Sequence, residues 1–140
     1  MVSQPYTVLV VDDVDVVRRT ANRILAKEGY RVLEAADAEE ALTFLAMPQS
    51  KVDLVLLDVV LPEKDGVALY AEICVHWPGV AVLFMSAYAA EILAARGQED
   101  LTVPFLAKPF TYYDLVTKVG AAIERRRTSR RKTRRHTPQP

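Results

Sequence analysis

Runs of apolar residues alternate with amphipathic segments along most of this chain. Five runs are rich in Val and Leu and lack a polar face, which is typical of parallel strands buried on both sides. They lie at residues 6–11, 31–35, 53–57, 80–85 and 103–107. Between them, helical spacing of apolar residues marks the segments 15–28, 38–47, 66–76, 89–96 and 112–126. The pattern predicts five strands that alternate with five helices.

This alternation predicts an α/β fold with three layers, in which a parallel sheet lies between two layers of helices. Right-handed crossovers place the carboxyl end of every strand at the same edge of the sheet, together with the loop that follows it. In doubly wound folds, ligands bind at this edge, where the strand order reverses. The residues that follow the predicted strands are therefore the candidates for chemistry.

Polar side chains follow four of the predicted strands. Asp12 and Asp13 follow the first strand, Asp58 the third, Ser86 the fourth and Lys108 the fifth. Three carboxylates form a hard, all-oxygen set of ligands that suits Mg²⁺ or Mn²⁺, and both ions also accept phosphate oxygens. A lysine ammonium and a serine hydroxyl can bind the phosphoryl group itself. Because Pro109 lowers the cost of a cis peptide bond, it is a candidate cis-proline that would direct Lys108 toward Asp58.

Four motifs support this interpretation in their order along the chain. They are VVDD at 10–13, LLDVVLPEKDG at 56–66, FMSAY at 84–88 and FLAKPF at 105–110. In these motifs the chain resembles the receiver domains of two-component response regulators, and the resemblance covers residues 6 to about 124. It implies a flavodoxin-like sheet of strand order 2-1-3-4-5. It also implies a function in a phosphorelay, in which a kinase phosphohistidine passes a phosphoryl group to an aspartate in the presence of Mg²⁺.

The resemblance assigns the acidic residues to two roles. Asp58 would be the phosphoacceptor and also a ligand of Mg²⁺. Asp13 would bind the ion directly, Asp12 largely through water, and the backbone carbonyl of Val60 would complete the set. Such a protein catalyses only its own phosphorylation and dephosphorylation, so we expect no enzyme activity toward other substrates.

The resemblance assigns other positions to the conformational change that follows phosphorylation and to the lifetime of the phosphorylated state. Ser86 and Lys108 would bind the phosphoryl oxygens, and Phe105 occupies the aromatic switch position of the family. Movement of these residues would change an output face formed by the fourth helix, fifth strand and fifth helix. Val60 and Tyr88 would flank the path of the hydrolytic water, which neither side chain is suited to orient. A long-lived phosphorylated state is therefore expected.

Residues at the same strand ends argue against two other classes of phosphate-binding protein. A dinucleotide site would need a glycine-rich turn after the first strand, where Asp12 and Asp13 stand. A phosphatase of the haloacid-dehalogenase type would need a second acid two residues after Asp58, and that position is Val60.

The net charge of zero conceals an uneven distribution. Residues 1–124 carry 10 Lys and Arg against 18 Asp and Glu, whereas residues 125–140 carry 8 Lys and Arg and no acid. We therefore divide the chain into a receiver domain, 1–124, and a basic tail, 125–140, that is either a helix extension or flexible. Because no reading module accompanies the tail, nucleic acid binding is expected to be a secondary activity at most.

Composition indicates the cellular compartment, and the resemblance indicates the partners. A single cysteine, Cys74, cannot form an internal disulfide, which fits a reducing cytoplasm. No apolar run approaches the ~20 residues of a membrane span, so we expect a soluble protein without membrane insertion. The resemblance implies a sensor histidine kinase or histidine phosphotransfer protein as donor and a downstream protein as target, and it leaves a homodimer open. The start at Met1 favours a stand-alone receiver, whereas FMSAY and FLAKPF resemble receivers fused to hybrid kinases.

Overall fold

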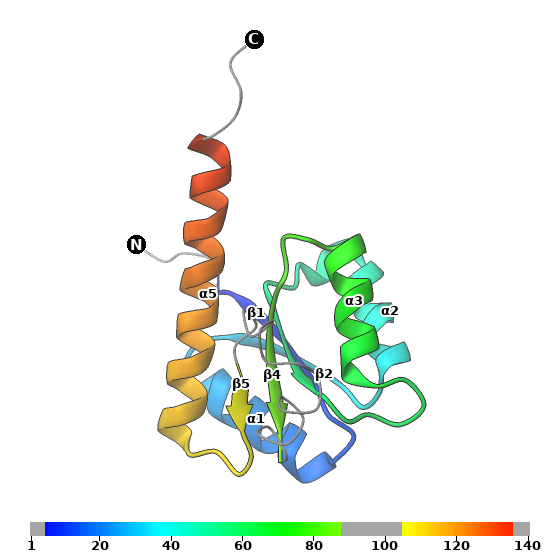
Figure 1. The fold of residues 1–140 in the computed structure, drawn as a ribbon. Helices are drawn as coiled ribbons and strands as arrows, with labels where there is room; N and C mark the ends of the chain where they lie inside the picture. The colour runs from blue at the N-terminus through cyan, green and yellow to red at the C-terminus, as the bar shows by residue number, and fades with distance from the viewer. Residues whose placement is uncertain (1–4, 88–104, 136–140) are drawn as a thin grey trace.

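A five-stranded parallel sheet forms the centre of the molecule (Figure 1). The structure, a computed structural model, describes residues 5–87 and 105–135, the last seven of these without side chains. The strands are β1 (Thr7–Val11), β2 (Arg31–Ala35), β3 (Leu54–Asp58), β4 (Ala81–Ser86) and β5 (Phe105–Ala107). Their order in the sheet is β2-β1-β3-β4-β5, and every pair of neighbours is parallel. This order confirms the doubly wound, flavodoxin-like fold that the sequence predicted.

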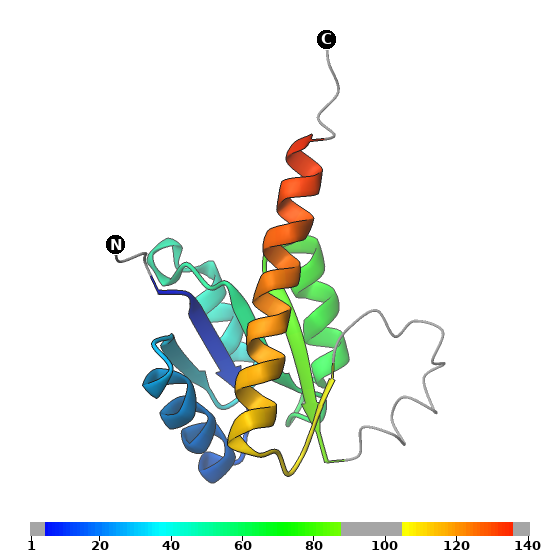
Figure 2. The ribbon, with the colours of Figure 1, turned by 90° about the vertical axis from the view of Figure 1, so that its left-hand side faces the viewer.

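Helices cover both faces of the sheet. They are α1 (Asp15–Lys27), α2 (Ala38–Ala46), α3 (Gly66–His76) and α5 (Tyr112–Arg135), with a 3₁₀ turn, η1, at Pro48–Ser50. α1 and α5 lie on one face, and α2 and α3 lie on the other (Figure 2). Four of the five predicted helices are therefore present among the described residues, and the one predicted over 89–96 lies outside them.

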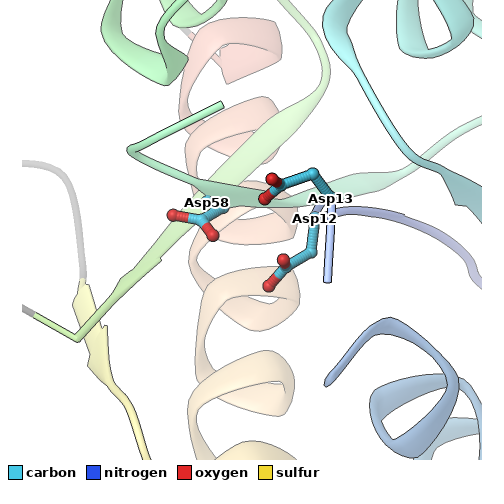
Figure 3. A group of neighbouring side chains, drawn as sticks. All are labelled: Asp12, Asp13 and Asp58. Atoms are coloured by element: carbon cyan, nitrogen blue, oxygen red, sulfur yellow. The ribbon is translucent and has the colours of Figure 1, made fainter. Parts of the chain in front are cut away.

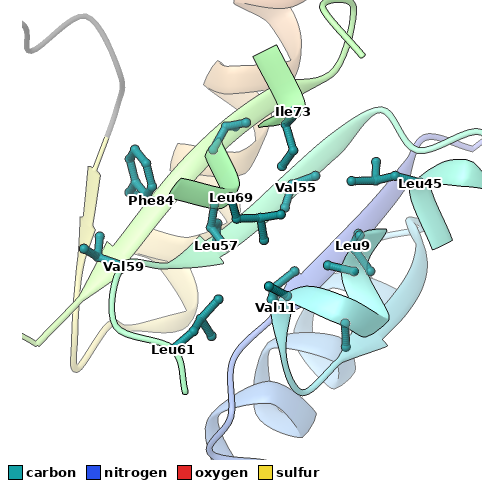
Figure 4. Close-up of a cluster of buried hydrophobic side chains, with 14 residues drawn as sticks. Leu9, Val11, Leu45, Val55, Leu57, Val59, Leu61, Leu69, Ile73 and Phe84 are labelled. Atoms are coloured by element: carbon teal, nitrogen blue, oxygen red, sulfur yellow. The ribbon is translucent and has the colours of Figure 1, made fainter. Parts of the chain in front are cut away.

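Two hydrophobic clusters form the core, one on each face of the sheet. Successive strand residues point to opposite faces, so Leu9 and Val11 of β1 pack toward α2 and α3. Figure 4 shows this cluster, which also contains Leu69 and Ile73 of α3. The alternate residues of β1 face α1 and α5 instead. The predicted burial on both sides is confirmed for β1, β3 and β4. It is wrong for β2 and β5, which are only partly buried because they are the edge strands of the sheet.

Short polar residues begin the two helices on the α2–α3 face. The Asp37 carboxylate accepts a hydrogen bond from the Glu40 amide at 2.8 Å, and the Asp65 carboxylate accepts one from the Ala68 amide at 2.8 Å. These bonds satisfy amide groups that have no partner inside the helix. α2 and α3 therefore begin directly after these two aspartates, and the capping bonds define where the preceding loops at the carboxyl edge of the sheet end.

The loop between β3 and α3 folds back tightly under the end of β3. A Cβ atom at Gly66 would lie 2.3 Å from the backbone oxygen of Asp58, so only glycine fits there. The Gly66 amide also donates to the carbonyl of Val59 at 2.7 Å. This close approach holds the backbone around Asp58 in place.

The last helix extends past the sheet. α5 packs on the sheet through Leu115, Val119, Ala122 and Ile123, all of which are buried. It then continues as one helix to Arg135, beyond the amino ends of the strands (Figure 2). Among the described residues, none of the helices combines the length and apolar composition that a bilayer-spanning segment requires.

Candidate functional site

Three carboxylates meet at the carboxyl edge of the sheet (Figure 3). Asp12 and Asp13 come from the end of β1 and Asp58 from the end of the neighbouring strand β3. Each offers an oxygen atom, and these oxygens lie within 4.8 Å of one another. Asp12 and Asp58 are buried, with 0% and 6% of their surface exposed, whereas Asp13 is open to solvent. The cluster is therefore a set of hard oxygen ligands with one side accessible.

Lys108 reaches into this cluster from the end of β5. Its Nζ lies 2.6 Å from Asp12 Oδ2 and 2.8 Å from Asp58 Oδ2. The peptide bond between Lys108 and Pro109 is cis, and the Lys108 amide donates to the carbonyl of Ser86 at 3.0 Å. The ends of β4 and β5 thus hold the ammonium against two buried carboxylates.

The charges in the site are unequally compensated. Burial raises the pKa of the Asp58 carboxyl, and so does the charge of Asp12, although the Lys108 ammonium and the Val60 amide act in the opposite direction. For Lys108, burial lowers the pKa, but the hydrogen bonds to Asp12 and Asp58 outweigh it, and the pKa is raised. The lysine therefore stays protonated across the neutral range.

Backbone amides orient both buried carboxylates. Asp58 Oδ1 accepts from the Val60 amide at 2.9 Å, while its other oxygen faces Lys108. Asp12 Oδ1 accepts from the Val14 amide at 2.8 Å, and its other oxygen also faces Lys108. Each carboxylate thus has a fixed orientation, which suits a binding site for a cation and an anionic group.

One contributor that the sequence did not single out is Arg18 in α1. Its guanidinium donates from Nη1 to the backbone carbonyl of Asp12 at 2.9 Å. The same side chain pairs with Asp15 at 2.7 Å and with Glu34 of β2 at 2.9 Å. Glu34 in turn accepts from Asn22 at 2.6 Å. Arg18 thereby fixes the peptide group between Asp12 and Asp13. The only sequence signal that could have indicated this role is a basic residue one helical turn after Asp15.

The remaining candidate residues lie around this centre. Ser86 is 1% exposed at the end of β4. Phe105 in β5 is half-buried, and its ring packs on Phe84 with centroids 5.5 Å apart. Val60 points outward beside Asp58 and is 58% exposed. Tyr88 and the segment of the predicted fourth helix lie outside the described residues.

Fold and site together define a flavodoxin-like α/β domain with an acidic centre and a lysine at its carboxyl edge. The profile of the family described as "Response regulator receiver domain" matches residues 8–120. The chain belongs to this family, the receiver domains of two-component response regulators.

Relatives at 30% identity and above include both kinases and regulators. The sensor kinase CckA of Brucella abortus (strain 2308) is 40% identical over 119 residues, which cover 85% of this chain and 13% of that protein. The transcriptional regulatory protein PdtaR of Mycobacterium tuberculosis (strain ATCC 25618 / H37Rv) is 31% identical over 122 residues, which cover 86% of this chain and 58% of that protein. The chain thus spans less than two thirds of either relative.

Solved structures of receiver domains superpose on this chain. The signal receiver domain of an HD domain-containing protein from Pseudomonas fluorescens Pf-5 has a TM-score of 0.79 and 26% identity, and covers 89% of this chain and 99% of its own. The receiver domain of the hybrid histidine kinase CckA has a TM-score of 0.70 and 34% identity, and covers 84% of this chain and 98% of its own. The resemblance stated from the motifs is confirmed.

Proposed function

We propose that this protein is a phospho-accepting receiver in which Asp58 takes a phosphoryl group from a phosphohistidine. The observation that supports this most directly is the bridge from Lys108 to Asp58 and Asp12, beside the third carboxylate of Asp13. A nucleophilic carboxylate, a cation to hold phosphoryl oxygens and a set of metal ligands are thereby within one site.

The donor set fits a divalent cation. Three carboxylates and one ammonium leave two negative charges, which a divalent ion neutralises. Asp12, Asp13, Asp58 and the carbonyl of Val60 would hold Mg²⁺, and Mn²⁺ suits the same oxygens. When bound, the ion supplies charge stabilisation to the phosphoryl oxygens.

The transfer step uses the chain's own groups. A carboxylate oxygen of Asp58 forms a bond to phosphorus as the P–N bond of the phosphohistidine breaks, and the histidine leaves with that electron pair. Lys108, whose raised pKa keeps it cationic, moves its hydrogen bond from Asp58 to a phosphoryl oxygen. The Ser86 hydroxyl donates to another phosphoryl oxygen. The carboxylates of Asp12 and Asp13 would hold the divalent cation, which would supply charge stabilisation to the phosphoryl group.

The output follows from the contact between β4 and β5. If Ser86 moves toward the phosphoryl group, it opens space beside the half-buried ring of Phe105, which can then turn inward from its present contact with Phe84. This movement would remodel the face formed by the predicted fourth helix, β5 and α5, and change its affinity for a downstream protein.

The donor is a sensor histidine kinase or a histidine phosphotransfer protein. Similarity to a sensor kinase and to the receiver of a hybrid histidine kinase supports a place in a phosphorelay. In such a relay the protein acts as a switch and modifies no other substrate.

Incubation with acetyl phosphate and Mg²⁺ tests the proposal. Mass spectrometry of the intact protein should show one added phosphoryl group in the wild type and none in Asp58→Asn. A matched control is Glu124→Gln, because this exposed carboxylate lies on α5 toward the amino ends of the strands, at the opposite edge from the site. Labelling of Asp58→Asn at the wild-type level would refute the assignment of the acceptor, and loss of labelling in the control would refute its specificity.

A further inference from the structure

Helix α5 has a second half that does not contribute to the domain core. Its last described contact with the rest of the domain is made by Arg126, with residues in the loops before β4 and β3. Arg126 Nε donates to the carbonyl of Gly79 at 2.5 Å, and Nη1 lies 3.2 Å from Asp53 Oδ1. Arg127 and Thr128, which follow, are exposed. The helix nevertheless continues to Arg135.

The part of α5 at 127–135, here called the basic segment, projects away from the site. At 1.5 Å per residue, its nine residues extend the helix by about 13 Å. They leave the sheet at the amino ends of the strands, whereas Asp12 and Asp58 lie at the carboxyl ends (Figures 1 and 2). The basic segment is therefore separate from the acidic centre and is not used in phosphoryl transfer.

The composition of the basic segment restricts what it can bind. It contains six Lys and Arg, two Thr and one Ser, with no acidic or apolar residue. Without an apolar stripe it lacks the seam of a coiled coil and the buried face of an interfacial membrane helix. Positions 127, 130, 131 and 134 fall in one i, i+3, i+4 row, where like charges repel one another. A polyanion would relieve this repulsion and stabilise the helix.

We infer that the basic segment binds the phosphate backbone of a nucleic acid duplex without reading its sequence. Five of its six cations are arginines, whose guanidinium groups bind phosphate in bidentate fashion. Serine and threonine hydroxyls also donate to phosphates. A helix about 10–12 Å wide fits a major groove about 12 Å wide. No aromatic residue is present to stack on the bases of a single strand.

Duplex binding by the basic segment depends on its helical structure, which composition alone did not predict. A receiver body with 10 Lys and Arg against 18 Asp and Glu repels nucleic acid, so binding is confined to the projecting segment. This inference goes beyond the proposed function, because phosphoryl transfer at Asp58 is independent of it.

Fluorescence anisotropy of an arbitrary 20-base-pair duplex with the full-length protein tests the inference. The log of the binding constant should fall linearly with the log of the salt concentration. The variant with Arg130→Gln, Arg131→Gln, Arg134→Gln and Arg135→Gln should lose about 3–4 units of that slope. A control removes four exposed cations of the body, Arg19→Gln, Arg23→Gln, Lys51→Gln and Lys118→Gln, and should keep the slope. Absence of binding at 50 mM salt, or an equal loss in the control, would overturn the inference.

Two further measurements test the helical mode and the class of partner. Ser129→Pro keeps every charge but interrupts the helix, and it should weaken duplex binding several-fold relative to Ser129→Ala. Equal affinity of these two variants would show that helicity is not needed and overturn the groove-binding mode. Poly-glutamate at the same concentration of charge should compete poorly, and competition equal to that of unlabelled duplex would assign the segment to acidic proteins instead. Tighter binding to the single strand would likewise overturn the assignment to a duplex.

Discussion

Lys108 Nζ lies 2.8 Å from Asp58 Oδ2, although the two residues are 50 positions apart in the chain. The contact exists because β5 and β3 flank β4 and all three strands end at the same edge. The same ammonium also contacts Asp12, so Lys108 and the divalent cation proposed for this site would neutralise the same two buried carboxylates. Its removal should therefore affect metal binding and phosphoryl transfer in opposite directions.

We predict that Lys108→Met binds Mg²⁺ several-fold more tightly and is phosphorylated about 10²-fold or more slowly. Affinity rises because a competing positive charge is lost, whereas transfer slows because no cation meets the phosphoryl oxygens. Calorimetric titration with Mg²⁺ and the rate of labelling by acetyl phosphate measure the two effects. Lys118→Met, on the exposed face of α5, serves as a control for both. A parallel change of affinity and rate in Lys108→Met would contradict this account.

A second prediction concerns stability in the presence of a chelator. Asp58→Asn should raise the free energy of unfolding at pH 7 by on the order of 1–2 kcal/mol, because it removes a buried charge while Lys108 keeps Asp12 as its partner. Burial raises the pKa of Asp58, so the folded state holds its proton more tightly than the unfolded state does. Wild-type stability from this group is therefore present at low pH and lost as pH rises through the raised pKa.

The pH dependence makes the second prediction specific. The advantage of Asp58→Asn should shrink as pH falls from the raised pKa of Asp58 toward about 4, and it should be smallest below that pH, where Asp58 becomes neutral in both states. Urea denaturation at several pH values measures this difference. Asp13→Asn is the matched control, because Asp13 is exposed and its loss removes no buried charge. A destabilised Asp58→Asn at pH 7 would show that the carboxylate contributes net stability.

The sequence was sufficient to predict most of the fold because strands buried on both sides leave a strong signal. The site followed from topology: Asp12, Asp13, Asp58 and Lys108 come directly after strands, and parallel strands bring their carboxyl ends together. Ser86 lies at the end of β4 for the same reason.

Other features depend on distances that no single sequence encodes. Nothing in the sequence shows that a Cβ atom at Gly66 would collide with the backbone oxygen of Asp58. Arg18 could be placed on a helix, but its hydrogen bond to the carbonyl of Asp12 depends on how α1 packs beside β2. The sequence also did not determine where α5 ends, since a run of arginines is compatible with either a helix or a coil.

A third prediction follows from Arg18. Arg18→Gln should weaken Mg²⁺ binding about tenfold, because the peptide between Asp12 and Asp13 loses the donor that fixes it. Arg18→Lys should rescue this loss only in part, since an ammonium cannot span the three partners that the planar guanidinium reaches. Calorimetric titration with Mg²⁺ measures both variants, and circular dichroism confirms that α1 is intact. Arg23→Gln, exposed on the same helix, should bind as the wild type does. Wild-type affinity in Arg18→Gln would assign the arginine to the packing of α1 alone.

The last prediction concerns the lifetime of the phosphorylated state. Hydrolysis of the acyl phosphate requires a water in line with phosphorus, and Val60 is the exposed side chain beside Asp58. Valine has no donor or acceptor with which to orient that water, and the resemblance places Tyr88, outside the described residues, on the other side of the path. Because loss of such positioning commonly costs ~10²-fold in rate, we predict slow autodephosphorylation. Val60→Asn combined with Tyr88→Glu should accelerate the decay measured after removal of the phosphodonor in Mg²⁺, while Val60→Ala should leave it unchanged. Decay of the native protein within seconds, or no acceleration in the double variant, would show that water access is controlled elsewhere.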